Sequence, residues 1–331
     1  MNVWLFLLAC QPIEEEDVLD PLAFYVDSED TSTTTTNGDT ATMDCFSERD
    51  QDLSLGITDH FRMWIQTSDF SNDLERTDLS GGSFGGLLSA TEDCPKLRPI
   101  VFVHGNSDRA LGGTYGGFAQ MTNTLKEYGY RSAELYATTY GPANPSQISN
   151  YTHNKANVLQ IRNFIEAVLE YTGAETVDVV AHSLGVTMAR KAILGGEATD
   201  DDGSSYDVGN PLTSKIKTFV GIAGANQGLI NCVGANVPVC SDLNGLLPTY
   251  WTATQSAFLQ NINENSHYEG QNVYSIWSSI DEIVQYQCMI GNVNTCQIPQ
   301  QDGQKVYDNL GHFQLKDQTG DVVYAMLQGT F

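Results

Sequence analysis

An apolar run that passes directly into a helical pattern constrains this chain more than any other feature of its sequence. Residues 176–181 read TVDVVA, a short run rich in β-branched residues that is typical of a strand buried on both faces of a sheet. Residues 184–194 follow with the pattern of an amphipathic helix, which Gly195-Gly196 ends. Only His182 and Ser183 separate the two patterns, so a sharp turn must join the strand to the helix.

The same alternation of strand and helix patterns extends over most of the chain. Apolar runs predict further strands at 98–104, 132–137, 215–222 and 271–276, and helical spacing predicts helices at 114–128, 155–171 and 319–327. Strands that alternate with helices favour an α/β fold with a largely parallel sheet. No internal repeat or long linker divides this region, so we expect a single domain over residues 45–331.

Ser183 occupies the sharp turn, where its hydroxyl would stand clear of the sheet. The pentapeptide Ala181-His182-Ser183-Leu184-Gly185 is a variant of G-x-S-x-G with Ala in the first glycine position. That motif places a nucleophilic serine on a strained strand-to-helix turn, and small residues two positions before and after the serine let the turn pack closely. We therefore interpret Ser183 as a nucleophile, with an ordinary buried turn serine as the alternative.

A nucleophile of this kind needs two backbone N–H groups that stabilise a developing oxyanion. The first expected donor is Leu184, the residue after the serine. The second is Asn106, which lies in the loop His104-Gly105-Asn106-Ser107-Asp108 directly after the 98–104 strand pattern. We interpret His104 as a residue that organises this loop.

The remaining partners should follow the serine in the order Asp or Glu, then His. Four of the six histidines precede the serine and a fifth lies in a polar stretch before the last main strand, which leaves His312 as the expected base. Asp281 is the first carboxylate after the 271–276 strand and is the expected acid, with Glu282 as the alternative. Two other carboxylates are expected on the surface or in turns: Asp178 and Asp207.

These stretches resemble the bacterial and nematode class 2 lipase family, within the α/β-hydrolase superfamily. The resemblance covers about residues 80–331 and includes RPIVFVHGNSD at 98–108, VDVVAHSLGVTMARKAI at 177–193, GIAGANQG at 221–228 and GHFQLKDQTG at 311–320. It implies an α/β-hydrolase fold with a mainly parallel central sheet flanked by helices. It also implies that Ser183 is the nucleophile, Asp281 the acid and His312 the base of carboxylic ester hydrolysis, with a lipid or ester as substrate.

We therefore expect a lipase or esterase that forms an acyl-enzyme and requires neither metal nor organic cofactor. Two alternatives stay open. The first is a depolymerase of polyhydroxyalkanoates, since the related enzymes include these. The second is a catalytically inactive surface lipoprotein that uses the same fold for adhesion, although nothing structural would demand a complete Ser–Asp–His set.

Two polar insertions interrupt the predicted elements. The segment 228–251 carries Tyr250 and Trp251 as expected substrate contacts, and it is either a lid or pocket wall, or a surface excursion fixed by a disulfide. A further expected contact is Tyr140, which follows a strand pattern. The insertion 197–210 contains Asp200-Asp201-Asp202-Gly203; its carboxylates suit Ca²⁺, but the spacing differs from an EF-hand loop and favours a solvated turn.

Seven cysteines indicate the compartment. Six remain when Cys10 is set aside, and an even set suits an oxidising environment. The equal spacing of eight predicts two local disulfides, which leaves a third pair, and no CxxC or HxxxH spacing supports zinc as the alternative. The expected pairs are Cys232–Cys240, Cys288–Cys296 and Cys45–Cys94.

The first 48 residues differ from the rest in charge. The chain has a net charge of −25, of which −11 lies in residues 1–48, where Lys and Arg are absent. Such acidity argues against nucleic-acid binding. Leu7-Leu8-Ala9-Cys10 ends a short apolar run and resembles a bacterial lipoprotein box, although no basic residue precedes it. We interpret residues 1–10 as a signal or lipoprotein-like segment, with membrane attachment through a lipidated Cys10. Residues 11–44 would then be an acidic, Thr-rich tether of a secreted or cell-envelope enzyme. An ordinary cytosolic N-terminus is the alternative.

Overall fold

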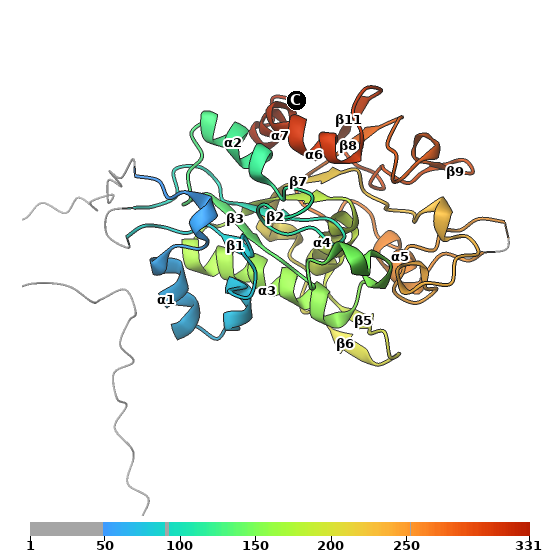
Figure 1. Cartoon of the computed structure of the whole chain (residues 1–331), viewed down its shortest axis with the longest axis horizontal. Helices are drawn as coiled ribbons and strands as arrows, with labels where there is room; N and C mark the ends of the chain where they lie inside the picture. The colour runs from blue at the N-terminus through green and yellow to red at the C-terminus, as the bar shows by residue number, and fades with distance from the viewer. Residues whose placement is uncertain (1–48, 90–92, 252) are drawn as a thin grey trace, which may run out of the picture. The chain divides into compact units, whose positions relative to one another are not determined.

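A seven-stranded sheet forms the centre of the computed structural model, which describes residues 49–89, 93–251 and 253–331 (Figure 1). The strand order is β1-β3-β2-β4-β7-β8-β11, in which β1 is antiparallel to β3 and every other neighbouring pair is parallel. This topology confirms the predicted α/β fold with a mainly parallel sheet. The strands are β1 (Ser83–Phe84), β2 (Ile100–Val103), β3 (Leu135–Thr138), β4 (Val177–His182), β7 (Ile216–Ile222), β8 (Asn272–Ser278) and β11 (Gly303–Tyr307).

Separate groups of helices cover the two faces of this sheet (Figure 1). One face carries α1 (Asp59–Thr67), α3 (Lys155–Thr172), α4 (Leu184–Leu194) and α5 (Ala257–Asn263); the other carries α2 (Ala119–Glu127), α6 (His312–Gln318) and α7 (Gly320–Gln328). Along β2, Val101 and Val103 pack on the first face, whereas Ile100 and Phe102 pack on the second. Burial on both faces explains why the strands read as continuous apolar runs.

Most predicted elements lie within a few residues of the observed ones, and two boundaries differ for local reasons. The helix expected over 114–128 begins at Ala119, because Gly116 and Gly117 have φ of 83° and 56° and form a turn before it. The strand expected from 132 begins at Leu135, because a turn closed by Glu134 N–H on the Arg131 carbonyl oxygen (3.0 Å) precedes it.

The expectation that Asp178 lies on the surface is wrong, whereas Asp207 is exposed in the short strand β6 (Ser205–Asp207). Asp178 is buried within β4, where its carboxylate accepts a hydrogen bond from Thr218 N–H (3.0 Å) and pairs with Arg98 (3.2 Å). Burial outweighs these partners and raises the pKa of Asp178 to about 7. The carboxyl of Asp178 therefore keeps its proton to a higher pH than it would in water, although Arg98 and Thr218 partly offset the cost of burial.

The acidic insertion folds back on the body as a hairpin of β6 with β5 (Glu197–Thr199). The carboxylate of Asp200 accepts from Lys155 N–H (2.9 Å), and that of Asp201 accepts from Thr152 Oγ1 (2.6 Å) and Asn244 Nδ2 (3.1 Å). These two carboxylates hold the hairpin in place through the protein's own donors. In the described ranges, no group of three His, Cys, Asp or Glu residues is arranged to hold a metal ion.

Two of the predicted disulfides are confirmed, Cys232–Cys240 and Cys288–Cys296. Cys94 is also disulfide-bonded, but its predicted partner Cys45 lies outside the described residues, as do the predicted segments 1–10 and 11–44. Those assignments stay predictions. Over the residues that the structure does describe, each helix is too short or too polar to cross a membrane.

Candidate active site

Ser183 lies between β4 and α4 in a strained backbone conformation. Its φ is 55° and its ψ is −128°, a combination that L-residues rarely adopt, and its N–H donates to the Ile222 carbonyl oxygen at 2.8 Å. Gly185 permits the turn, because a Cβ at that position would lie 2.2 Å from the His104 backbone oxygen. This geometry gives a physical reason for the small residue that the sequence motif requires.

The loop after β2 lies directly against this serine. A Cβ on Gly105 would be 2.9 Å from the Cβ of Ser183, so only glycine allows the loop to approach so closely. The side chain of Asn106 is held at both ends, since Nδ2 donates to the Ile148 carbonyl oxygen (2.9 Å) and Oδ1 accepts from the Ser107 hydroxyl (2.7 Å). The side-chain amide of Asn106 is thus already engaged, so the backbone N–H is the group of Asn106 that could donate to a substrate oxygen.

Leu184 is the first residue of α4, and an N–H group in the first turn of a helix has no intrahelical acceptor. The backbone N–H groups of Leu184 and Asn106 are thus the two expected oxyanion donors. Both residues line the same cavity as Ser183.

His104 holds the loop from within, as expected. Its Nε2 accepts from Tyr140 N–H (3.1 Å), which leaves Nδ1 to donate to the Gly105 carbonyl oxygen (2.7 Å). Full burial lowers the pKa of His104 to about 3, so the ring stays neutral and keeps these hydrogen bonds. Tyr140 stacks flat on this ring, with centroids 4.2 Å apart, and is fully buried. The expectation that Tyr140 contacts substrate is therefore corrected: the residue supports His104 from behind the loop, and it is not among the residues that line the cavity.

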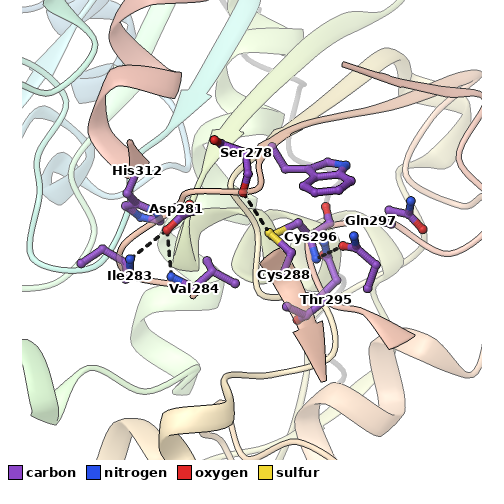
Figure 2. Close-up of a disulfide and its surroundings, with 12 residues drawn as sticks. Ser278, Asp281, Ile283, Val284, Cys288, Thr295, Cys296, Gln297 and His312 are labelled. Carbon is purple, nitrogen blue, oxygen red and sulfur yellow. Dashed lines mark hydrogen bonds and ion pairs between the residues drawn. A yellow bond between two sulfur atoms is a disulfide. The ribbon is translucent and has the colours of Figure 1, made fainter. Parts of the chain in front are cut away.

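His312 and Asp281 form a buried pair (Figure 2). His312 Nδ1 lies 2.8 Å from Asp281 Oδ2, while Asp281 Oδ1 accepts from the N–H groups of Ile283 (2.9 Å) and Val284 (2.8 Å). The neighbouring Glu282 instead accepts a hydrogen bond from the backbone N–H of His312 at 2.9 Å. Asp281 rather than Glu282 therefore contacts the imidazole ring, and it does so at Nδ1.

His182 packs against the ring of His312 and contacts its backbone. Its ring centroid lies 4.7 Å from that of His312, and its Nε2–H donates to the His312 carbonyl oxygen at 3.2 Å. Burial first, and then the nearby His312, lower the pKa of His182 well below the usual value. His182 is consequently a neutral packing partner, a role that sequence reasoning did not assign to it.

One cavity of about 260 Å³ contains both Ser183 and His312. Its walls are mainly apolar and come from loops after several strands. The segment 228–251 contributes three of the lining side chains and is therefore a pocket wall, while Tyr250 and Trp251 do not line the cavity and Trp251 is 91% exposed. The apolar lining is formed by Ile148, Ala223, Ala225, Leu229, Val239, Leu246, Ile283, Val284 and Phe313, with Tyr115 beside them.

Several of these residues carry no sequence signal that would have identified them. Ile148 lies in a short helical turn (Pro145–Asn150) without apolar periodicity, and Tyr115 reaches the site by stacking on Phe313, with ring centroids 4.7 Å apart. Phe313 follows His312 directly, so its position beside the expected base was the one available indication.

Comparisons with known proteins bear on the family and the fold of this chain. The family model described as lipase (class 2) matches residues 97–325, within the 80–331 expected from the sequence. Among solved structures, the Bacillus licheniformis lipase BlEst2 in its mature form is 13% identical, covers 74% of this chain and 96% of its own, and has a TM-score of 0.47. Aspergillus fumigatus lipase B is 12% identical over 83% of this chain, with a TM-score of 0.44, and the match spans only 55% of that protein.

Proposed function

The chain belongs to the class 2 lipase family and is thereby a carboxylic ester hydrolase; from this premise we propose that it cleaves esters through Ser183, His312 and Asp281. The observation that carries the proposal is the 2.8 Å pair of His312 and Asp281 in the same cavity as a strained serine. The order of the three residues along the chain fits the superfamily pattern.

Acylation begins when Ser183 Oγ attacks the ester carbonyl carbon and His312 Nε2 takes the hydroxyl proton. The carbonyl π electrons move to oxygen, and the N–H groups of Leu184 and Asn106 stabilise the resulting oxyanion. One such donor contributes about 2.7–4 kcal/mol to transition-state stabilisation. Asp281 fixes the tautomer of the neutral imidazole and stabilises the imidazolium that forms. When the tetrahedral intermediate collapses, the C–O bond to the alcohol breaks and His312 protonates the leaving oxygen.

Deacylation repeats these steps with water in place of serine. His312 removes a proton from water, hydroxide adds to the acyl carbon, and the intermediate expels Ser183 Oγ, which regains the proton. The acid product then leaves. The apolar walls around Ser183 suit the acyl part of a lipid or other ester, because burial of its methylene groups is favourable by about 0.8 kcal/mol each.

We propose in addition that this enzyme works outside the cytoplasm, tethered through Cys10. The two disulfides and the bonded state of Cys94 support an oxidising compartment. Mass spectrometry of the protein extracted from cell envelopes should find a diacylglyceryl thioether on Cys10, and Cys10→Ser should release the enzyme from membranes. An unmodified Cys10 in envelope-bound protein would count against the anchor.

The test of the catalytic proposal is labelling with a fluorophosphonate probe together with turnover of p-nitrophenyl esters. Ser183→Ala should abolish both, whereas Ser149→Ala removes another hydroxyl from the same cavity and should keep labelling at Ser183. Full turnover by Ser183→Ala would contradict the assignment of Ser183 as the nucleophile. A panel of triglyceride, short ester and polyhydroxyalkanoate would separate the lipase from a depolymerase, and a wild type that the probe does not label would be the inactive adhesion protein.

A further inference from the structure

The turn that follows Asp281 has an unusual backbone. Gln285, Tyr286, Gln287 and Cys288 have φ of 62°, 49°, 59° and 61°, so four consecutive residues other than glycine have positive φ. The Cβ atom disfavours this region for L-residues, which enter it mostly as single residues. Such a stretch persists only where the surrounding structure holds it.

The disulfide Cys288–Cys296 closes this turn at its last residue (Figure 2). Both cysteines are buried, and the sulfur of Cys288 lies 3.7 Å from the Ser278 carbonyl oxygen at the end of β8. Thr295, next to Cys296, donates from its N–H to the Cys288 carbonyl oxygen (2.8 Å) and from its hydroxyl to Gly228 (2.7 Å). The disulfide therefore ties the turn to two fixed parts of the body.

The other end of the turn is the candidate acid. Gln285 N–H donates to the backbone oxygen of Asp281 at 2.9 Å, and two of the three residues between them, Ile283 and Val284, supply both N–H groups that bind Asp281 Oδ1. One of these, Val284, is buried against Cys288 and Cys296 and also lines the cavity. A continuous series of contacts thus runs from the disulfide to the carboxylate that orients His312.

We propose that the Cys288–Cys296 disulfide is a positioning element for Asp281, an inference that rests on the proposed function. The disulfide holds the 285–288 turn left-handed, and the turn aims the Ile283 and Val284 N–H groups at Oδ1, which leaves Oδ2 facing His312 Nδ1. Reduction breaks the S–S bond and forms two thiols, with two electrons and two protons supplied by a dithiol such as dithiothreitol, itself oxidised to a cyclic disulfide. The freed turn can then relax to ordinary φ, and the carboxylate loses its fixed direction.

A matched pair of variants tests this. Cys288→Ala/Cys296→Ala and Cys232→Ala/Cys240→Ala each remove a disulfide with a sequence separation of 8, but only the first adjoins the acid. On p-nitrophenyl acetate, whose acyl group is too short to depend on the walls, the first should lower kcat by about tenfold or more with KM little changed. The second loosens the 228–251 wall and should act mainly on KM for long esters. Equal losses of kcat in the two variants would overturn the proposal.

Glycine rescue separates positioning from a general loss of stability. Tyr286 and Gln287 have exposed side chains, and glycine adopts positive φ without strain. Adding Tyr286→Gly and Gln287→Gly to Cys288→Ala/Cys296→Ala should restore part of kcat, and this combined variant also serves if the double variant folds poorly. If the combined variant folds but shows no recovery of kcat, the proposal is contradicted. The proposed function stands apart: if Asp281→Asn abolishes turnover while the disulfide variant is fully active, only the positioning role fails.

Discussion

A Cβ on Gly185 would lie 2.2 Å from the backbone oxygen of His104, where the first turn of α4 lies against the loop after β2. Gly185→Ala must therefore push this loop away from Ser183, and with it the Asn106 N–H. We expect kcat to fall by about tenfold or more, because oxyanion donors act only when they are in place, and we expect a lower Tm.

Gly196→Ala is the matched control, two residues beyond the other end of the same helix. Nothing lies within 4 Å of a Cβ there, although its φ of 70° makes the substitution strained, at about 1 kcal/mol. This control should lose some stability and keep its kcat. If kcat for p-nitrophenyl butyrate were as high in Gly185→Ala as in the wild type, the loop would not depend on this contact.

The strand-to-helix turn at Ser183 and the sheet could be predicted from the sequence, because strands buried on both faces read as continuous apolar runs. The run at 176–181 and the helix at 184–194 are observed at Val177–His182 and Leu184–Leu194. Only part of the cavity wall could be predicted. The segment 228–251 is expected as a wall or as a surface excursion, but Ile148 and Tyr115 reach the site through segments whose course is set by tertiary contacts. Asp178 shows the same limit, since the residues that contact its carboxylate, Arg98 and Thr218, are distant in sequence.

The acid and its neighbour should respond differently to loss of charge. Asp281→Asn replaces the carboxylate that faces His312 Nδ1 with an amide, so the imidazole tautomer is no longer fixed and the imidazolium is no longer stabilised. We expect kcat to fall by about 10⁴-fold, as in other Ser–His–Asp sites. Glu282→Gln keeps an oxygen acceptor for the backbone N–H of His312 and should lose far less. Steady-state kinetics at constant pH compare the two; a larger loss in Glu282→Gln would reverse the assignment of the acid.

The wall at Ile148 should control the preference for long acyl chains. This side chain lines the cavity yet is 48% exposed, so its replacement costs little stability, and its backbone oxygen keeps the hydrogen bond from Asn106. Ile148→Ser removes apolar contact from the acyl chain and should raise KM for decanoate esters several-fold, about 1 kcal/mol, while kcat for acetate changes little. Kinetics across a series of p-nitrophenyl esters measure this. An unchanged chain-length profile would place the acyl chain elsewhere.

His153 should make folding sensitive to mild acid. The residue is fully buried between the Asn244 carbonyl oxygen (2.8 Å) and Thr187 Oγ1 (2.7 Å), and burial lowers its pKa to about 4. The unfolded chain, with a histidine pKa of about 6.5, therefore binds more protons between these values, so stability falls as pH falls from 6.5 to 4. At pH 5 this one residue should reduce the free energy of unfolding by about 2 kcal/mol relative to pH 7.5.

His153→Gln can form similar hydrogen bonds and cannot titrate in this range. The variant loses the stacking of His153 on Phe258, whose ring centroids lie 3.9 Å apart, so it should be less stable than the wild type at pH 7.5. Its additional loss between pH 7.5 and pH 5 should nevertheless be smaller, by about 2 kcal/mol. Urea unfolding at the two pH values measures both quantities. Parallel pH dependences in the two proteins would mean that His153 does not remain neutral in the fold, because a histidine protonated in both states cannot couple folding to pH.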